Sequence, residues 1–184
     1  KGNDVISFGY DSEGRRISKT VNGQTTEYFY AGDMVIGEES AANGKITYIY
    51  DDAGRISALR RTINGATSTY HLLSNSRGDV EAIYSEDGTL IARYIYDAHG
   101  NEIKREFGES ESHRAMADIN PFRYRGYMYD NETGLYYVSS RYYDPEIGRW
   151  INEDDSDVLG IEPDSLLHYN LFAYCWNNPV NMTD

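Results

Sequence analysis

Apolar and polar residues alternate along most of the first hundred residues of the chain. The clearest runs are residues 26–30, 45–50 and 90–96. In each run one set of alternate positions is apolar and the other carries Tyr or charged side chains, which predicts strands buried on one face. Turn-forming dipeptides separate the runs: Asn22-Gly23, Asn43-Gly44 and Asn64-Gly65. We therefore expect residues 8–107 to form consecutive antiparallel hairpins in one long meandering sheet.

A short repeat, Tyr-Asp-x-x-Gly with an Ile shortly after it, punctuates this region. Copies begin at Tyr10, Tyr50 and Tyr96, and weaker copies occupy residues 75–80 and 84–90. An Asp side chain accepts a hydrogen bond from the backbone two residues on, and Gly adopts the left-handed conformation that closes a short loop. We interpret these Asp residues as turn formers, not ligand-binding groups. A lone hairpin is marginally stable in water, so the repeats must stack on their neighbours.

The chain divides into three parts by pattern. Residues 1–108 carry the hairpins, and residues 109–118 are polar, lack alternation and predict a linker loop. Residues 119–184 have a different texture, with weak helical spacing near residues 165–174. The predicted fold class is all-β, with a short irregular or helical C-terminal segment.

Charge and composition exclude several classes of function. The chain has 17 Lys and Arg against 30 Asp and Glu, a formal charge of −13, which argues against nucleic acids and anionic membranes as partners. No apolar run approaches the roughly 20 residues that span a bilayer. The four His residues lack metal-ligand spacing, so we expect no metal and no cofactor. We expect the single cysteine, Cys175, to be a small buried hydrophobic residue without thiol chemistry.

Residues 120–184 are dense in Arg, Tyr and Gly. The recurring motifs are Tyr129-Asp130, Thr133-Gly134-Leu135-Tyr136-Tyr137, Arg141-Tyr142-Tyr143-Asp144-Pro145, Gly148-Arg149-Trp150 and Asn177-Asn178-Pro179. With these motifs the chain closely resembles the core of Rhs and YD-repeat proteins, and the Tyr-Asp repeats extend the resemblance back to residue 10. The Arg residues interleaved with Tyr, namely Arg123, Arg125, Arg141 and Arg149, we interpret as packing internally on carboxylates and aromatic rings.

The resemblance implies a fold and a partner. Members of this family wind their hairpins into a hollow spiral shell, and in many bacterial relatives a variable toxin domain follows the core in the same polypeptide and is held inside. The expected partners are therefore that downstream toxin domain and the remainder of the shell. The resemblance also implies a secreted or cell-surface location.

The resemblance further implies a single-turnover aspartyl self-protease that releases the downstream domain. Peptide hydrolysis by two carboxylates requires them to share a proton, one acting as base and the other as acid. By position in the family pattern the catalytic candidates are Asp130 and Asp154, with Arg141 as the cation that keeps one carboxylate ionised or binds the oxyanion. Asp144, which precedes Pro145, predicts a turn and is the reserve candidate.

Two alternatives remain open. Many relatives have Pro after the residue that Asp154 matches, whereas this chain has Asp155, and the bond to be cut is expected beyond Asp184. A non-catalytic structural or binding module, holding a partner or a carbohydrate, is therefore the alternative to self-cleavage. On that interpretation Asp130 is a turn carboxylate and Asp154 belongs to a solvated acidic run. A piece of a longer spiral also exposes unpaired strand edges, which predicts edge-to-edge self-association.

Overall fold

The computed structural model describes residues 4–152, 172–175, 178–180 and 182, and it confirms the all-β fold. Ten strands form one antiparallel sheet whose spatial order equals their order in the sequence. These strands are β1 (Ile6–Tyr10), β2 (Arg16–Val21), β3 (Gln24–Ala31), β4 (Met34–Ser40), β5 (Gly44–Tyr50), β6 (Ile56–Ile63), β7 (Ala66–Ser74), β8 (Val80–Ser85), β9 (Leu90–Tyr96) and β10 (Glu102–Phe107). The meander predicted from alternation is therefore present.

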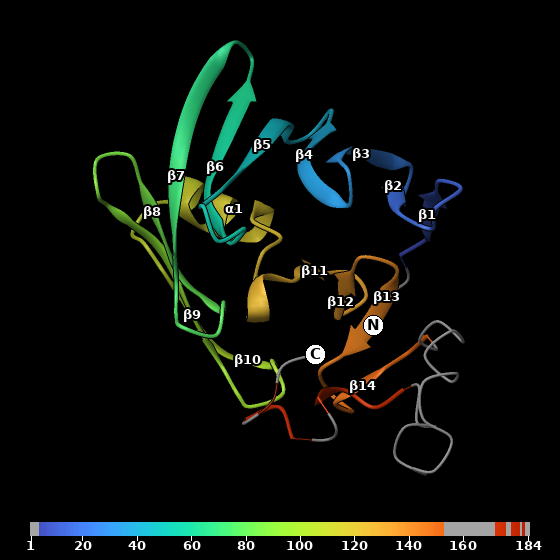
Figure 1. Ribbon diagram of the computed structural model, residues 1–184. Helices are drawn as coiled ribbons and strands as arrows, with labels where there is room; N and C mark the ends of the chain where they lie inside the picture. Colours follow the sequence, from blue (N-terminus) through green and yellow to red (C-terminus); the bar gives the residue numbers. More distant parts are fainter. Residues whose placement is uncertain (1–3, 153–171, 176–177, 181, 183–184) are drawn as a thin grey trace, which may run out of the picture.

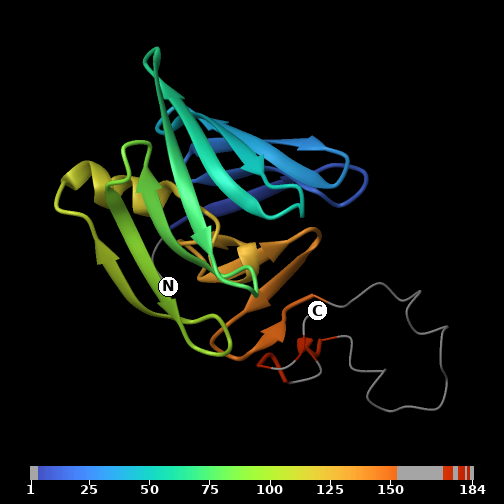
Figure 2. The same cartoon turned by 60° about the vertical axis from the view of Figure 1, so that its left-hand side comes forward.

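The remaining elements lie on the concave side of this sheet, which curls around them (Figures 1 and 2). They are α1 (Glu111–Ile119), the 3₁₀ turn η1 (Tyr124–Gly126), β11 (Met128–Asp130), β12 (Leu135–Val138), β13 (Arg141–Asp144) and β14 (Arg149–Trp150). Strands β11 to β14 form a second, four-stranded antiparallel sheet. The large sheet is thus a curved wall, and the elements from α1 to β14 pack against its concave side.

The three Tyr-Asp copies fold into the same turn. In each copy one carboxylate oxygen of the Asp accepts the backbone N–H groups of the residues two and four positions on, at 2.8–3.0 Å. The Gly of each copy has a φ between 74° and 89°, a region that other residues adopt at a cost. Asn75, in a weaker copy, accepts the same two bonds. The predicted turn geometry is therefore present.

Tyrosines at the ends of strands also stabilise the hairpins through hydrogen bonds of their hydroxyl groups. The Tyr50 hydroxyl donates to the carbonyl of Val35 at 2.6 Å, and the Tyr96 hydroxyl donates to the carbonyl of Val80 at 2.8 Å. Each of these bonds ties the end of one strand to the start of the preceding strand, next to the bulge that this preceding strand makes in its pairing with the strand before it. In a Tyr-Asp copy the Asp therefore forms the turn, while the Tyr hydroxyl can form a hydrogen bond to the preceding strand.

One hydrophobic core joins the wall to the elements inside it. Fully or nearly fully buried side chains from both parts take part, including Ile46, Leu59, Val80, Ile83, Ala92, Met116, Ala117 and Phe122. The Tyr48 and Phe122 rings meet edge to face with centroids 4.8 Å apart. Because this apolar surface is shared, removing the inner elements would expose the concave face of the wall to water.

The prediction of a linker loop at residues 109–118 is wrong, because most of this segment belongs to helix α1. The Ser110 side chain caps the helix by accepting the His113 backbone N–H at 3.2 Å. Only Met116 and Ala117 are buried, and the helix packs on β9. Two apolar side chains at one end are too few to produce a visible helical period. Of the segment with weak helical spacing, residues 165–171 lie outside the described residues, and residues 172–174 are not helical.

Candidate functional site

The small sheet separates two of the predicted catalytic residues. Asp130 lies opposite Leu135 at one end of the β11–β12 pair, whereas Arg141 lies opposite Val138 at the other end of β12. The structure therefore does not bring Asp130 and Arg141 together. Asp154, the third predicted residue, lies outside the described residues.

Asp130 is the centre of a buried ion cluster with the wall. Its side chain is 2% exposed; one oxygen lies 2.5 Å from an Arg16 guanidinium nitrogen and the other 3.0 Å from Lys19 Nζ. Lys19 also contacts Glu132 at 3.0 Å. Burial alone would lower the pKa of Arg16, but the attraction of Asp130 outweighs it and raises that pKa above its usual value. The cluster joins β2 of the wall to the end of β11.

Aromatic rings enclose the Arg16 side chain, which is 1% exposed. Its guanidinium carbon lies 4.3 Å from the ring centroid of Tyr137 and 4.9 Å from that of Tyr28. The backbone N–H of Arg16 also donates to the Tyr137 hydroxyl at 2.7 Å. Sequence reasoning missed Arg16, because it is simply the second Arg after a hairpin turn and its partner is 114 residues away.

A buried acid, Glu38 on β4, faces the same region. It is 7% exposed, and burial raises the pKa of its carboxyl, with Tyr48 and the nearby cations opposing that rise. A cavity of about 180 Å³ lies between the wall and the small sheet here, lined in part by Lys19, Glu38 and Glu132. This polar pocket was not predicted from the sequence.

Arg141 lies on β13 with its guanidinium carbon 3.9 Å from the ring centroid of Trp150. The β13–β14 pairing continues beyond Trp150, since the Ile151 N–H donates to the Tyr142 carbonyl at 2.7 Å and Asn152 Oδ1 accepts the Tyr142 N–H at 3.1 Å. This register carries the chain to a position beside Arg141. Asp154 follows Asn152 by two residues in the sequence.

The C-terminal segment returns to the same place. Residues 172–175 run beside β14: Ala173 forms an antiparallel bridge with Arg149, and the Trp150 N–H donates to the Phe172 carbonyl at 3.1 Å. Cys175 is fully buried in this aromatic cluster, as predicted for a small hydrophobe. Three parts of the chain therefore meet at Trp150. They are Arg141, the strand β14 that precedes the acidic run in the sequence, and residues 172–175.

The reserve candidate Asp144 makes a turn contact. Its carboxylate accepts the Glu146 N–H at 2.8 Å in the turn between β13 and β14. This is the geometry expected for Asp before Pro in a turn. Across the strand pair Asp144 lies opposite Arg149.

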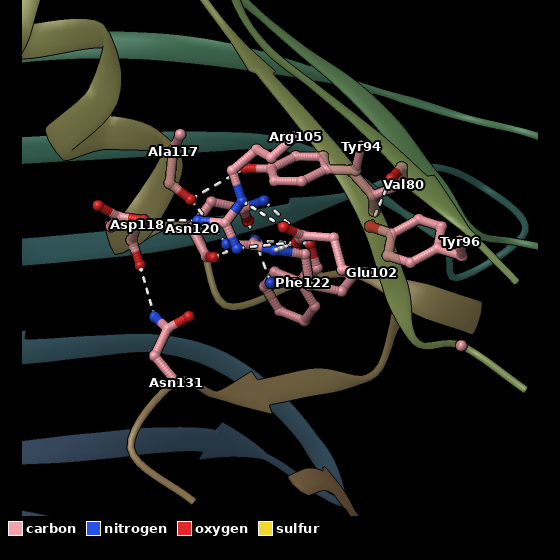
Figure 3. A network of polar contacts seen from close by, with 12 residues as sticks. Val80, Tyr94, Tyr96, Glu102, Arg105, Ala117, Asp118, Asn120, Phe122 and Asn131 are labelled. Atoms are coloured by element: carbon pink, nitrogen blue, oxygen red, sulfur yellow. Dashed lines mark hydrogen bonds and ion pairs between the residues drawn. The ribbon is translucent and has the colours of Figure 1, made fainter. Parts of the chain in front are cut away.

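A second polar network fixes the end of helix α1 (Figure 3). Arg123, 1% exposed, donates to the Ala117 carbonyl at 2.7 Å and lies 4.2 Å from the Tyr94 ring centroid. Arg105 pairs with Glu102 at 2.7 Å and with Asp118 at 2.5 Å. The carbonyl groups at a helix C-terminus attract cations, so this network holds α1 against β9 and β10. Internal packing of the Tyr-interleaved arginines is confirmed for Arg123, and also for Arg141 over Trp150.

The described part of the chain contains neither a metal-binding cluster nor a membrane-spanning helix. Within it, no three His, Cys, Asp or Glu side chains are grouped so that they could hold a metal ion. No helix in those residues has the length and apolar character needed to cross a bilayer.

The antiparallel hairpins form a curved wall around the inner elements α1 to β14, and Tyr-Asp turns connect some of its strands. This arrangement defines a YD-repeat shell. The family model for the teneurin YD-shell matches residues 1–180, and the chain belongs to this family. The resemblance inferred from the motifs is therefore confirmed.

Individual relatives agree with this assignment. Over its whole length the chain is 42% identical to the tRNA3(Ser)-specific nuclease WapA of Bacillus spizizenii, and it covers 8% of that protein. Over 98% of its length it is 26% identical to Teneurin-4 of Homo sapiens, covering 6% of that protein. The crystal structure of TcdB2-TccC3 shares the fold over the whole chain, with a TM-score of 0.75 and 22% identity, and the match covers 9% of that structure. The chain thus spans less than a tenth of each.

Proposed function

We propose that this chain is a segment of a YD-repeat shell that encloses and carries a toxin domain located further along the same polypeptide. The observation that carries this proposal is the curved wall whose concave face is covered by the chain's own C-terminal elements. Relatives named as a tRNA nuclease and as a double-stranded DNA deaminase toxin support a toxin as the cargo. The remainder of the shell is then the second partner, and we place the protein at the cell surface or outside the cell.

Protection from protease tests the carrier role. In the full-length polypeptide we expect a protease added from outside to leave the domain after the shell uncut, while the same domain expressed alone is degraded. The control is a variant with a protease site inserted at the exposed Asn64-Gly65 turn, which should be cut and thereby report that the protease is active. A C-terminal domain cut as fast in the full-length protein as in isolation would contradict encapsulation.

We further propose self-cleavage as a second function of the same segment. The supporting observation is the convergence at Trp150 of Arg141, the strand leading to Asp154 and the C-terminal chain. In the sequence only Glu153 stands between Asn152 and Asp154, and two residues of chain bridge at most about 7 Å. One carboxylate would take a proton from the attacking water while the other protonates the peptide carbonyl, and the proton held by the first then passes to the leaving amine.

The second carboxylate of the pair stays a prediction. Asp130 was assigned by its match to the family pattern, but both of its oxygens are held by cations of the wall. That pairing supports an anchoring role for Asp130.

Intact mass of the full-length polypeptide decides between these roles. We expect the parent to split and the Asp154→Asn and Arg141→Gln variants to remain whole. A folded Asp130→Asn variant that still splits would assign Asp130 to the anchor, and one that stays whole would assign it to catalysis. A folded parent that stays whole would establish the non-catalytic alternative. The presence of Asp155 in place of proline would then be the sequence difference that accompanies it.

A further inference from the structure

The polar cavity between the wall and the small sheet has room for more than a single water molecule. It has a volume of about 180 Å³, and its lining comes from strands β2 to β4 on one side and from residues 118–132 on the other. A water molecule takes up about 30 Å³ in the liquid. Gln24 and Asn131, which belong to the lining, are exposed, so the cavity opens to solvent.

Four acidic side chains line this cavity, and three of them are matched by cations. The matched pairs are Asp130 with Arg16 and Lys19, Glu132 with Lys19, and Asp118 with Arg105. The fourth acid is Glu38 on β4. The charges around the cavity are therefore one cation short, and the shortage lies at Glu38.

Glu38 is buried without an ion pair among the described residues. Its side chain is 7% exposed, and Lys19 and Arg16 favour its anion only from beyond contact distance, because both are engaged by Asp130. The Tyr48 hydroxyl also favours the anion, but it makes no hydrogen bond of good geometry. A carboxylate can accept about four hydrogen bonds, so most of the capacity of Glu38 is unused. A buried carboxylate in this condition is costly unless a cation joins it.

We propose that this cavity binds one small organic cation, whose guanidinium group pairs with the Glu38 carboxylate. A guanidinium presents two parallel N–H donors that match the two oxygens of a carboxylate. Val21, Ile119 and Met128 also line the cavity and offer apolar contact to a short alkyl stem. The described residues group no three acids closely enough for a metal ion, which favours an organic cation. This site is independent of cargo and of self-cleavage.

Isothermal titration calorimetry of the full-length polypeptide at pH 8 tests the site, with butylguanidine as the probe. We expect one butylguanidine to bind per chain, and Glu38→Gln to weaken that binding at least tenfold, because it removes the charged acceptor and keeps the shape. Glu39→Gln, on the neighbouring exposed residue, is the matched control and should bind as the parent does. Butylurea has the same shape as butylguanidine but no charge, and should give no measurable binding.

Two results would overturn the proposal. One is the absence of saturable binding to the parent, and the other is equal affinity of butylguanidine for the parent and for folded Glu38→Gln. Butylurea binding as tightly as butylguanidine would do the same, since shape alone would then explain the site. A capped Gly-Arg-Gly peptide distinguishes the sources of the cation. Binding of this peptide with similar affinity would assign the cavity to an arginine side chain of a polypeptide, whereas binding of butylguanidine alone would assign it to a free small molecule.

Discussion

Glu38 is a carboxyl whose charge is poorly accommodated where it lies. It is 7% exposed, and burial raises its pKa, while Lys19 and Arg16 attract its anion and Asp130 repels it. An acid whose pKa is higher in the folded than in the unfolded chain favours folding most below its ordinary value of 4.5 and loses that contribution as the pH rises through the folded value. The contribution of Glu38 to the stability of the wall should therefore decrease as the pH rises from acid toward neutral.

Glu38→Gln tests this directly. Its melting temperature, measured by differential scanning fluorimetry between pH 4.5 and 8, should exceed that of the parent by an amount that grows with pH. Glu39→Gln, on the neighbouring residue whose side chain is exposed, is the control and should follow the parent. Parallel profiles for the parent and Glu38→Gln would show that Glu38 is not responsible.

Asp130 and Arg16 form an ion pair sealed from water, with side-chain exposures of 2% and 1%. Removing one partner leaves the other charge buried and uncompensated, which costs roughly 3–5 kcal/mol. We expect Asp130→Ala to lower the free energy of unfolding by about that amount in urea titrations. The control is Glu106→Ala at the exposed pair with Lys104, which should have little effect. A loss at Asp130 no larger than that at Glu106 would exclude the anchoring role.

At the scale of elements, the Tyr-Asp turn depends on the acceptor oxygens of the Asp more than on its charge. Asp97 accepts the His99 and Asn101 backbone N–H groups at 2.8 and 2.9 Å, and Asn75 accepts the equivalent pair without a carboxylate. Asp97→Ala should therefore destabilise the chain by about 1 kcal/mol, measured by urea unfolding, whereas Asp97→Asn should be nearly neutral. Equal losses for both variants would mean that the charge matters.

How much of the fold the sequence predicts depends on how local each signal is. The hairpins follow from alternation and from turn residues a few positions apart, so the ten-stranded meander was predictable. Helix α1 was not, because only Met116 and Ala117 face the core. The cluster at Asp130 was not, because its partners Arg16 and Lys19 are more than a hundred residues away and no local pattern pairs them. Arg141 was assigned from resemblance, and its neighbour Trp150 became evident only in three dimensions.

At the scale of the whole molecule, the meander leaves two strands, β1 and β10, at the ends of the large sheet. Such edges offer unpaired backbone groups to another chain. The β10 edge also displays Ile103 and Phe107, which are 65% and 38% exposed. We therefore expect the 184-residue chain on its own to self-associate through an edge, as a strand of the remaining shell would pair with it in the full-length protein.

Net charge sets how this association depends on salt. With a formal charge of −13, two copies repel one another, and added salt screens that repulsion. Sedimentation velocity should show a larger associated fraction at 0.5 M than at 0.05 M salt, because the screening length falls from about 14 to about 4 Å over that range. Ile103→Lys, which adds a charge at the edge, should reduce association, while Ile147→Lys, at a turn where Ile147 is 60% exposed, should not. A monodisperse monomer at high protein concentration in both salts would show that the edges are protected in this chain by their own twist and charges.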